Sequence, residues 1–370
     1  MKKRVIVAAA AALMVAATLV PASANAADAG HSPIIVLGEI SYRPSGLTAG
    51  GRLDVDASGT AYVADFWGGG IAKSPASGPP TVLVHDAPGL IGAIAHRSGT
   101  VYYTERGEVP RWGENPELWL MSVSTSGGSP KKIADLGAWY STRVPDATNR
   151  YGFVGLPQSC SDQFGQDASP VRYGSSHYEP ASAIATASGV FVADPGRNVV
   201  LKITYSGAIS VAAVLPPAPA TLASQELVTF RRYPDCAVGY RYIPEPGPTG
   251  IALGPDGNLY VTTIPDQLFY ADVVLPGGLY RINPATGAST RIIGNLRVPY
   301  GVTAAPSGTL YIKEGLGGTN QLGPISVVRV NSRVARPLTE GGGGVDIRLV
   351  KDRLYTTGSG VVAVTPLSYR

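Results

Sequence analysis

Six stretches of the sequence share one pattern, in which two short segments of alternating apolar residues flank a tight turn. The clearest copy runs from Gly247 to Thr263, with its reversal at Pro255-Asp256-Gly257-Asn258. Alternation with a period of two on both sides of such a turn predicts a β-hairpin. A chain that repeats one hairpin many times must pack the copies against each other, so their spacing indicates the architecture.

The six copies align on one aromatic residue, which lies in the second segment of each hairpin. This residue is found at Tyr62, Tyr102, Phe191, Tyr260, Tyr311 and Tyr355. A repeated hairpin with a period of roughly 40 to 50 residues is typical of a β-propeller blade. The steps from Tyr102 to Phe191 and from Phe191 to Tyr260 are longer and are interpreted as one blade plus an insertion. With 46 Gly, 31 Pro and 19 Tyr in 370 residues, the chain is expected to be all-β, a six-bladed propeller.

The two ends of the repeat region complement each other. After the sixth hairpin only Val361–Val364 remains as a further strand, so the last blade lacks its outermost strand. An isolated β-like run at Ile34–Leu37 precedes the first hairpin. Pairing the two would cover an exposed edge, so we expect an N-terminal strand to complete the C-terminal blade and close the ring.

The first 26 residues have the three parts of a secretory signal peptide. Lys2, Lys3 and Arg4 precede an apolar run from Val5 to Val20, and Ala24-Asn25-Ala26 is a small-residue cleavage site. The alternative, an uncleaved membrane anchor, needs a run nearer to about 20 residues. Residues 1–26 are therefore expected to be a signal peptide and residues 27–370 a single propeller domain, secreted to the extracellular space without a lipid anchor or a further membrane span.

The net charge argues against two classes of partner. Removing the three basic residues of the signal segment lowers the formal net charge from +4 to +1, and no basic stripe is left. Nucleic acid and anionic membranes are recognised by such stripes, so neither is expected as a partner of the mature chain. The expected partner is a small molecule, a glycan or a protein, and the expected state is a monomer.

The chain has two cysteines, Cys160 and Cys236, both in the exported part. Two thiols in an oxidising compartment are expected to form a disulfide. In the entropic model, a closed loop of this length constrains the unfolded chain by about 4 kcal/mol. The alternative, a metal site with two thiolate ligands, has no further candidate ligands nearby.

Both cysteines lie in insertions that depart from the repeat pattern, at about residues 137–178 and 216–246. Long loops on a rigid scaffold are where binding commonly occurs, although an ordered cap without a ligand explains them as well. Basic and aromatic residues alternate in the second insertion and are candidates for stacking on a sugar or planar ligand; packing between the loops is the alternative. These candidates are Arg231, Arg232, Tyr233, Tyr240, Arg241 and Tyr242.

The second strand of each hairpin ends in an acidic or polar residue, and in a propeller these ends gather around one mouth of the central channel. The residues are Asp65, Glu105, Asp194, Thr263, Glu314 and Thr357. Converging carboxylates could bind a divalent cation or act as acid and base. Because the feature recurs in every repeat, hydrogen bonding to nearby backbone amides is the favoured interpretation. No nucleophile elbow, zinc-binding helix motif, phosphate-binding loop or Cys-x-x-Cys motif accompanies them.

The stretch Ala193-Asp194-Pro195-Gly196-Arg197-Asn198-Val199-Val200-Leu201-Lys202-Ile203, the Gly247–Thr263 hairpin and the segment Gly278-Leu279-Tyr280-Arg281-Ile282 resemble secreted NHL-like six-bladed propellers. Within that group the chain looks most like the ScyD/ScyE family of exported bacterial proteins. The resemblance spans roughly Leu53 to Val364 and implies the fold, but no reaction is tied to a motif of that family. The two cysteine-bearing insertions are departures from it.

A more distant resemblance connects the chain to gluconolactonase-like and regucalcin-like propellers. It implies a calcium-dependent lactonase with a central metal held by Glu, Asn and Asp. By position, Asp194 and Glu314 match two of these ligands, and no Asn partner is found. We therefore expect a secreted binding or scaffold module that is not an enzyme, with a metal-dependent hydrolase or lactonase that uses calcium as the alternative.

Overall fold

The computed structural model of the 370-residue chain describes residues 35–47, 51–65, 69–85, 87, 89–107, 117–165, 169–175, 177–268, 275–315, 323–339, 344–358 and 360–369. The expected signal peptide, residues 1–26, lies outside the described residues. Among those described, no helix is both long and apolar enough to cross a bilayer.

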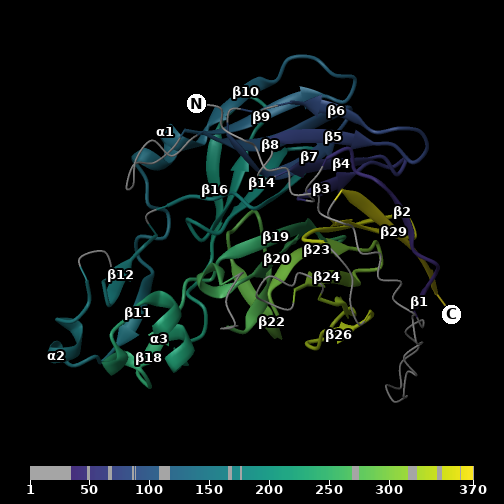
Figure 1. Ribbon diagram of the computed structural model, residues 1–370. Helices are drawn as coiled ribbons and strands as arrows, with labels where there is room; N and C mark the ends of the chain where they lie inside the picture. The colour runs from purple at the N-terminus through teal and green to yellow at the C-terminus, as the bar shows by residue number, and fades with distance from the viewer. Residues whose placement is uncertain are drawn as a thin grey trace, which may run out of the picture.

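The described chain is organised as seven antiparallel sheets, six of which contain the repeats (Figure 1). In five of these six the strands follow one another in chain order outward from the innermost strand, and in the sixth two N-terminal strands both pair with the third strand. The first three sheets are β3 (Leu53–Val55), β4 (Ala61–Asp65), β5 (Gly70–Ser74), β6 (Thr81–Val84); β7 (Leu90–Arg97), β8 (Thr100–Arg106), β9 (Leu118–Ser124), β10 (Lys131–Asp135); and β13 (Ser182–Thr186), β14 (Gly189–Asp194), β15 (Val199–Ile203), β16 (Ile209–Val214). The next three are β19 (Pro248–Leu253), β20 (Leu259–Thr263), β21 (Gly277–Ile282), β22 (Ser289–Leu296); β23 (Pro299–Ala304), β24 (Leu310–Glu314), β25 (Ile325–Val328), β26 (Arg336–Pro337); and β27 (Ile347–Val350), β28 (Arg353–Gly358), β29 (Val361–Tyr369), β1 (Ile35–Leu37), β2 (Ser41–Pro44).

The six innermost strands form a closed ring. β3 contacts β7, β7 contacts β13, and so on through β19, β23 and β27, which contacts β3 again. A separate hydrophobic cluster fills each interface between neighbouring sheets, as where Tyr62 of β4 packs with Ile91 and Tyr103 of the next sheet. The prediction of an all-β propeller is confirmed, and this ring is the observation that supports a count of six blades.

The ring is closed by the N-terminal segment, as expected, but this segment contributes two strands and not one. β1 pairs with the end of β29, where Leu37 lies opposite Leu367, and β2 pairs with its beginning, where Ser41 lies opposite Val364. The expected pairing of Ile34–Leu37 with Val361–Val364 is therefore shifted, because β29 is long enough to bind two successive N-terminal strands. β2 was not anticipated.

The two insertions form the seventh sheet, which lies to one side of the ring, at the lower left of Figure 1. This insertion sheet has the strand order β12-β11-β18-β17, so that one strand pair comes from each insertion. Its elements are α1 (Leu136–Ser141), β11 (Arg150–Val154), α2 (Gln158–Ser161), β12 (Val171–Tyr173), β17 (Thr221–Leu222), α3 (Gln225–Arg231), η1 (Asp235–Ala237) and β18 (Arg241–Ile243). The 3-10 turn η2 (Pro265–Gln267) follows β20.

The two faces of the insertion sheet differ in burial, because successive side chains along a strand point to opposite faces. Phe153 of β11 and Tyr242 of β18 are buried on the inner face, where they pack with Cys160 and α3, and Tyr151 of β11 is buried on the same face. The Cys160–Cys236 disulfide, with Cα atoms 5.8 Å apart, ties one insertion to the other. The predicted disulfide is confirmed.

Candidate functional site

One asparagine of the ring connects both insertions to the propeller. Asn198 ends the turn between β14 and β15 in a left-handed conformation (φ 55°), which asparagine adopts more readily than most residues. Its Nδ2 donates to Asp146 Oδ2 at 2.9 Å and to Glu245 Oε2 at 3.2 Å. Its Oδ1 accepts from the Gly247 amide at 3.1 Å. A single fully buried side chain therefore joins the first insertion, the second insertion and the ring; we call this region the junction.

Asp146 is held in the junction by neutral donors, and no cation of the described part of the chain forms an ion pair with it. Besides Asn198, its carboxylate accepts from the Tyr151 hydroxyl at 2.9 Å and from the Ser175 amide at 3.1 Å. The Tyr151 hydroxyl also accepts from Asn149 Nδ2 at 3.0 Å. Burial, followed by the Asp146 charge, raises the pKa of Tyr151, so it stays a neutral donor. Three neutral donors compensate this buried charge.

The second carboxylate of the junction, Glu245, is paired with arginine. Arg172 of β12 donates to Glu245 Oε1 through Nε at 2.8 Å and through Nη2 at 2.6 Å. Its Nη2 also lies 4.0 Å from Asp266 Oδ1. Burial lowers the pKa of Arg172, but the charges of Glu245 and Asp266 outweigh that effect and raise it. The guanidinium is therefore a permanent cation between two acids.

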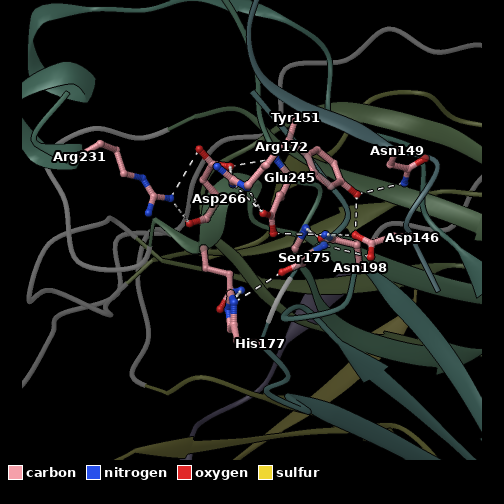
Figure 2. Close-up of polar contacts among 12 residues, drawn as sticks. Asp146, Asn149, Tyr151, Arg172, Ser175, His177, Asn198, Arg231, Glu245 and Asp266 are labelled. Atoms are coloured by element: carbon pink, nitrogen blue, oxygen red, sulfur yellow. Dashed lines mark hydrogen bonds and ion pairs between the residues drawn. The ribbon is translucent and has the colours of Figure 1, made fainter. Parts of the chain in front are cut away.

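Asp266 completes the junction from η2, where it also has a left-handed backbone (φ 52°). Its carboxylate accepts from the Tyr242 hydroxyl at 2.6 Å and the Glu245 amide at 2.8 Å, and lies 3.5 Å from Arg231 Nη2. Figure 2 shows the resulting chain of contacts, running from Arg231 through Asp266 and the Arg172–Glu245 pair to Asn198 and Asp146. Every carboxylate in it has donors, so the junction is built to fix the insertions in place rather than to leave an acid open for catalysis.

At the solvent margin of the junction lies His177. Its Nε2 is 3.3 Å from Gln267 Nε2, and its Nδ1 is 3.5 Å from the Ser175 hydroxyl. The Ser175 pair is too long for an activated nucleophile, which needs roughly 2.6–3.2 Å. No third group that would orient the imidazole as in a catalytic triad contacts it among the described residues.

The six residues predicted to bind a ligand are distributed over different environments. Tyr242, Tyr233 and Tyr240 pack with the hydrophobic cluster under the insertion sheet, and Arg231 donates to the Asp266 carbonyl at 2.6 Å. Arg232 ends α3 in a left-handed conformation, while Arg241 is exposed on the outer face of the sheet. They do not converge on one pocket, and the packing alternative describes the tyrosines. Ligand binding by these residues stays a prediction.

Asp194, one of the two predicted metal ligands, is fully buried at the end of β14. Its Oδ1 accepts from the Glu179 amide at 2.8 Å and the Gly196 amide at 2.9 Å. Burial raises its pKa to about 6, and the two amides and the nearby Tyr140 hydroxyl only partly oppose that rise. Among the described residues, no donor reaches its other oxygen, Oδ2, at hydrogen-bonding geometry. The carboxylate organises the turn that leads to Asn198.

Glu314, the second predicted ligand, is similarly engaged at the end of β24. Its Oε2 accepts from the Arg297 amide at 2.6 Å, and its Oε1 accepts from the Ser326 hydroxyl. The polar ends of two other hairpins are also bonded: the Thr357 hydroxyl donates to the Gly51 carbonyl at 2.6 Å, and the Gly278 amide donates to the Thr263 hydroxyl at 3.1 Å. These contacts match the favoured interpretation, in which strand-end residues stabilise turns.

The central channel itself contains arginine. Arg348 of β27 donates from Nε to Asp54 Oδ1 at 3.2 Å, from Nη1 to Asp346 Oδ1 at 2.9 Å, and from Nη2 to the Ala183 carbonyl at 3.3 Å. It therefore connects three sheets, two of which lie opposite each other in the ring. Toward the other end of the channel, Arg52 donates to the carbonyls of Tyr300 (2.8 Å) and Val345 (3.1 Å).

These positions do not fit a calcium ion. Calcium takes six to eight oxygen ligands, and in the part of the chain that the structure describes no cluster of three or more His, Cys, Asp or Glu side chains is arranged to hold a metal. The channel carboxylates Asp54 and Asp346 are ion-paired with Arg348. Asp194 and Glu314 are directed at backbone amides or a hydroxyl. The structure therefore supports no reaction step that uses calcium at these residues.

Sequence reasoning missed the junction and the channel arginine. A signal for the channel was present, because Asp54 and Arg348 are charged residues between apolar neighbours in innermost strands. For the junction, Asn198 lies in the turn that carries the family resemblance. Nothing in the sequence indicated that Asp146 and Glu245 would meet there.

Solved structures with similar folds were found, although no protein-family model matches the sequence and no curated protein is significantly similar to it. A gluconolactonase from Xanthomonas campestris superposes with a TM-score of 0.53 at 14% identity, covering 91% of this chain and 94% of that one. Virginiamycin B lyase from Staphylococcus aureus gives 0.50 at 15% identity, covering 89% and 99%. The calcium-binding protein regucalcin from Agrobacterium tumefaciens gives 0.50 at 13%, covering 88% and 92%. Identities this low show the propeller fold alone.

Proposed function

We propose that this protein is a secreted binding module that contacts its partner through the outer face of the insertion sheet. The register places seven side chains on that face: Arg150, Val154, Val171, Tyr173, Leu222, Arg241 and Ile243. Tyr173 is 65% exposed and Leu222 is 68% exposed. Large side chains this exposed, on the solvent side of a regular sheet, are the observation that carries the proposal.

The rigidity of the insertion sheet supports the same function. Its inner face is anchored by buried aromatic residues, by the disulfide and by the junction, in which Asn198 and Arg172 are both engaged. A surface that is held in one conformation before binding loses less conformational entropy on association. The junction therefore serves the outer face by keeping it preorganised.

The composition of the outer face favours a protein partner with acidic and apolar side chains. Five of its residues are apolar or aromatic, two are arginines, and none is acidic. Aromatic residues and arginine are enriched at the energetically dominant positions of protein interfaces. The ScyD/ScyE resemblance, which implies an exported protein, agrees with a partner outside the cell.

The alternative, a calcium-dependent lactonase, rests on the fold shared with a gluconolactonase and with regucalcin. It is tested by thermal unfolding with calcium and with a chelator. A calcium-dependent rise in Tm that is lost in Asp194→Asn or Glu314→Gln variants would favour the lactonase. We expect Tm to be the same in both conditions.

The binding function is tested by site-specific photo-crosslinking in the culture medium of the producing organism. A photoreactive phenylalanine analogue is placed at Tyr173 or Leu222, and at Val330 as a control that is also exposed but lies on the ring. We expect one reproducible, mass-identified protein adduct at the two outer-face positions and none at Val330.

Charge reversal then tests the chemistry of the contact. Arg241→Glu on the outer face is expected to reduce the adduct at least tenfold and to make the remainder insensitive to salt. The matched control is Arg336→Glu, an exposed arginine on the edge strand of a ring sheet. Equal adduct yield in both variants, or equal labelling from Val330, would contradict the proposed contact surface.

A further inference from the structure

The channel has a cavity at the end where the innermost hairpins turn, on the side opposite the strand ends that carry Asp194 and Glu314. This cavity has a volume of about 250 Å³ and is lined by innermost-strand residues from all six ring sheets, among them Asp54, His96, Ile184, Ile251, Thr303 and Arg348. A second depression of about 300 Å³ adjoins it and shares Leu253 and Ala304. We call the first cavity the hairpin-side mouth.

Two hydrogen-bond donors at the base of this mouth are left over from the contacts among the described residues. The Asp54 carboxylate already accepts from the amides of Val55 and His96 and from Arg348 Nε. Arg348 has five N–H groups, and the contacts to Asp54, Asp346, Ile347 and Ala183 occupy four of them, leaving one on Nη2. The Thr303 hydroxyl accepts from the Leu349 amide at 3.0 Å, so its hydrogen is available to a ligand.

The charged groups at the base of the mouth are paired with one another, and aliphatic side chains alternate with polar groups around its walls. Arg348 is ion-paired with both Asp54 and Asp346, and Arg52 lies further along the channel. Because Arg348 is already paired with both carboxylates, none of these three groups is free to act as the counter-charge of an ionised ligand. The walls come from Ile184, Ile251, Leu253 and Val302. An ionised ligand would lose its hydration here without gaining a counter-charge.

We propose that the hairpin-side mouth is a binding site for a small uncharged molecule with an apolar body and a carbonyl-type acceptor. The acceptor would receive hydrogen bonds from Thr303 and from Arg348 Nη2, while the body would contact the aliphatic walls. A cavity of about 150 Å³ holds benzene, so this mouth has room for a molecule of one to two rings. The site is separate from the outer face of the insertion sheet, and either can fail without the other.

The proposal is tested with three fluorinated probes of similar size: 4-fluoroacetophenone, 4-fluorobenzoate and 1-ethyl-4-fluorobenzene. Binding to the full-length mature protein is measured from the broadening of each probe's 19F signal. We expect the ketone to bind tightest, the hydrocarbon at least threefold more weakly and the carboxylate at least tenfold more weakly. A carboxylate that binds as tightly as the ketone would overturn the neutral-ligand assignment, and a hydrocarbon that binds as tightly would overturn the role of the donors.

Variants locate the site. Leu253 is 45% exposed at the rim, so Leu253→Trp should fill the mouth without disturbing the core, and we expect it to abolish ketone binding. Val211→Trp, at a 40% exposed position on the outermost strand β16 of a ring sheet, is the matched control and should bind the ketone normally. Thr303→Val should weaken the ketone three- to tenfold and leave the hydrocarbon unchanged. Thr303→Ser, which retains the hydroxyl, should restore binding and covers the case in which the valine variant fails to fold. Unchanged ketone binding in Leu253→Trp overturns the proposal.

Discussion

The channel and the junction both bury carboxylates, but they compensate them in different ways. In the channel, Asp54 and Asp346 share one arginine, Arg348, whose guanidinium connects three sheets of the ring. In the junction, Asp146 is held by an amide, a phenol and a backbone N–H, and only Glu245 and Asp266 contact arginine. The two channel carboxylates thus share one cation, whereas the three junction carboxylates use two arginines together with several neutral donors.

The two ways of compensating buried carboxylates follow from the parts that each region connects: ring sheets in the channel, and the insertions with the ring in the junction. The ring is closed by repeated hairpins whose hydrophobic interfaces already fix neighbouring sheets, so one cross-channel contact suffices at the axis. The insertions have no repeat to pack against and must be oriented by specific polar contacts. Neutral donors provide direction with little desolvation cost, whereas a buried ion pair costs several kcal/mol to desolvate. Dependence on one residue should therefore be greatest in the channel.

The largest effect is expected from Arg348→Met, which removes the channel cation and keeps much of its volume. Asp346 and the largely buried Asp54 would lose their ion-pair partner, and breaking a buried pair in this way costs about 3–5 kcal/mol. The free energy of unfolding, measured by urea denaturation, should fall by about 4 kcal/mol. A double variant, Arg348→Met with Asp346→Asn, should recover part of this loss. If it recovers none, the loss is one of packing and not of charge.

A smaller but still large effect is expected from Asn198→Ala in the junction. The change removes three hydrogen bonds and leaves Asp146 and Glu245 each without one donor, at a cost of about 1–3 kcal/mol for each buried group left unsatisfied. We expect a loss of about 3 kcal/mol in the same assay.

The control for that change is Asn331→Ala. Asn331 also has a left-handed backbone (φ 62°), but it is exposed. Its replacement reports the backbone cost alone, which we expect to be about 1–2 kcal/mol at most. Similar losses in the two variants would show that backbone strain, and not the shared amide, accounts for the effect of Asn198.

A pH-dependent effect is expected at Asp194, which leads into the junction turn. Burial raises its folded-state pKa to about 6, above the ordinary value of 3.8, so the folded state binds more protons between those values. Stability should therefore fall as pH rises from about 4 to about 6, through ionisation of this carboxyl. Two pKa units correspond to about 3 kcal/mol at most.

Asp194→Asn isolates this contribution, because the amide keeps an acceptor oxygen and does not ionise. Relative to the unmodified protein, the variant should gain about 2–3 kcal/mol between pH 4 and pH 7, as measured by urea denaturation at each pH. If the free energies of unfolding of Asp194→Asn and of the unmodified protein differ by the same amount at every pH, the raised pKa of Asp194 is contradicted.

The sequence predicted the ring far better than the junction, and the reason is the range of the contacts. Each hairpin is local: the aromatic residues at Tyr62, Phe191 and Tyr311 lie in the second strand of their hairpins, as aligned. Ring closure could be inferred because a missing strand at one end of the repeats and a spare strand at the other were both visible. The register of the N-terminal strand on β29 could not be inferred, because the length of β29 was not apparent.

The junction instead joins residues that no local pattern relates. Asn198 bonds Asp146 and Glu245 across 52 and 47 residues, and the pairing of β11 with β18 exists only once both insertions are placed together. The alternation of basic and aromatic residues around Arg231 and Tyr242 was visible, but the strand parity that buries Tyr242 and exposes Arg241 depends on that pairing. Composition alone could not separate binding residues from core.

The smallest effect is expected at the surface pair of Arg281 and Asp256, the aspartate in the turn of the clearest hairpin. Arg281 Nη2 lies 2.9 Å from Asp256 Oδ2, but the two side chains are 50% and 33% exposed. Solvent screens exposed pairs of this kind, so Arg281→Ala should lower the free energy of unfolding by about 0.5 kcal/mol or less, and by less still at high salt. The Asp256 carboxylate also accepts from the Asn258 amide at 3.2 Å and from the Tyr260 hydroxyl at 3.0 Å, so Asp256→Ala should cost more than Arg281→Ala. Urea denaturation at low and high salt measures both. A loss in Arg281→Ala comparable to that in Arg348→Met would show that burial is not what separates the channel from the surface, and the distinction between the two regions would fail with it.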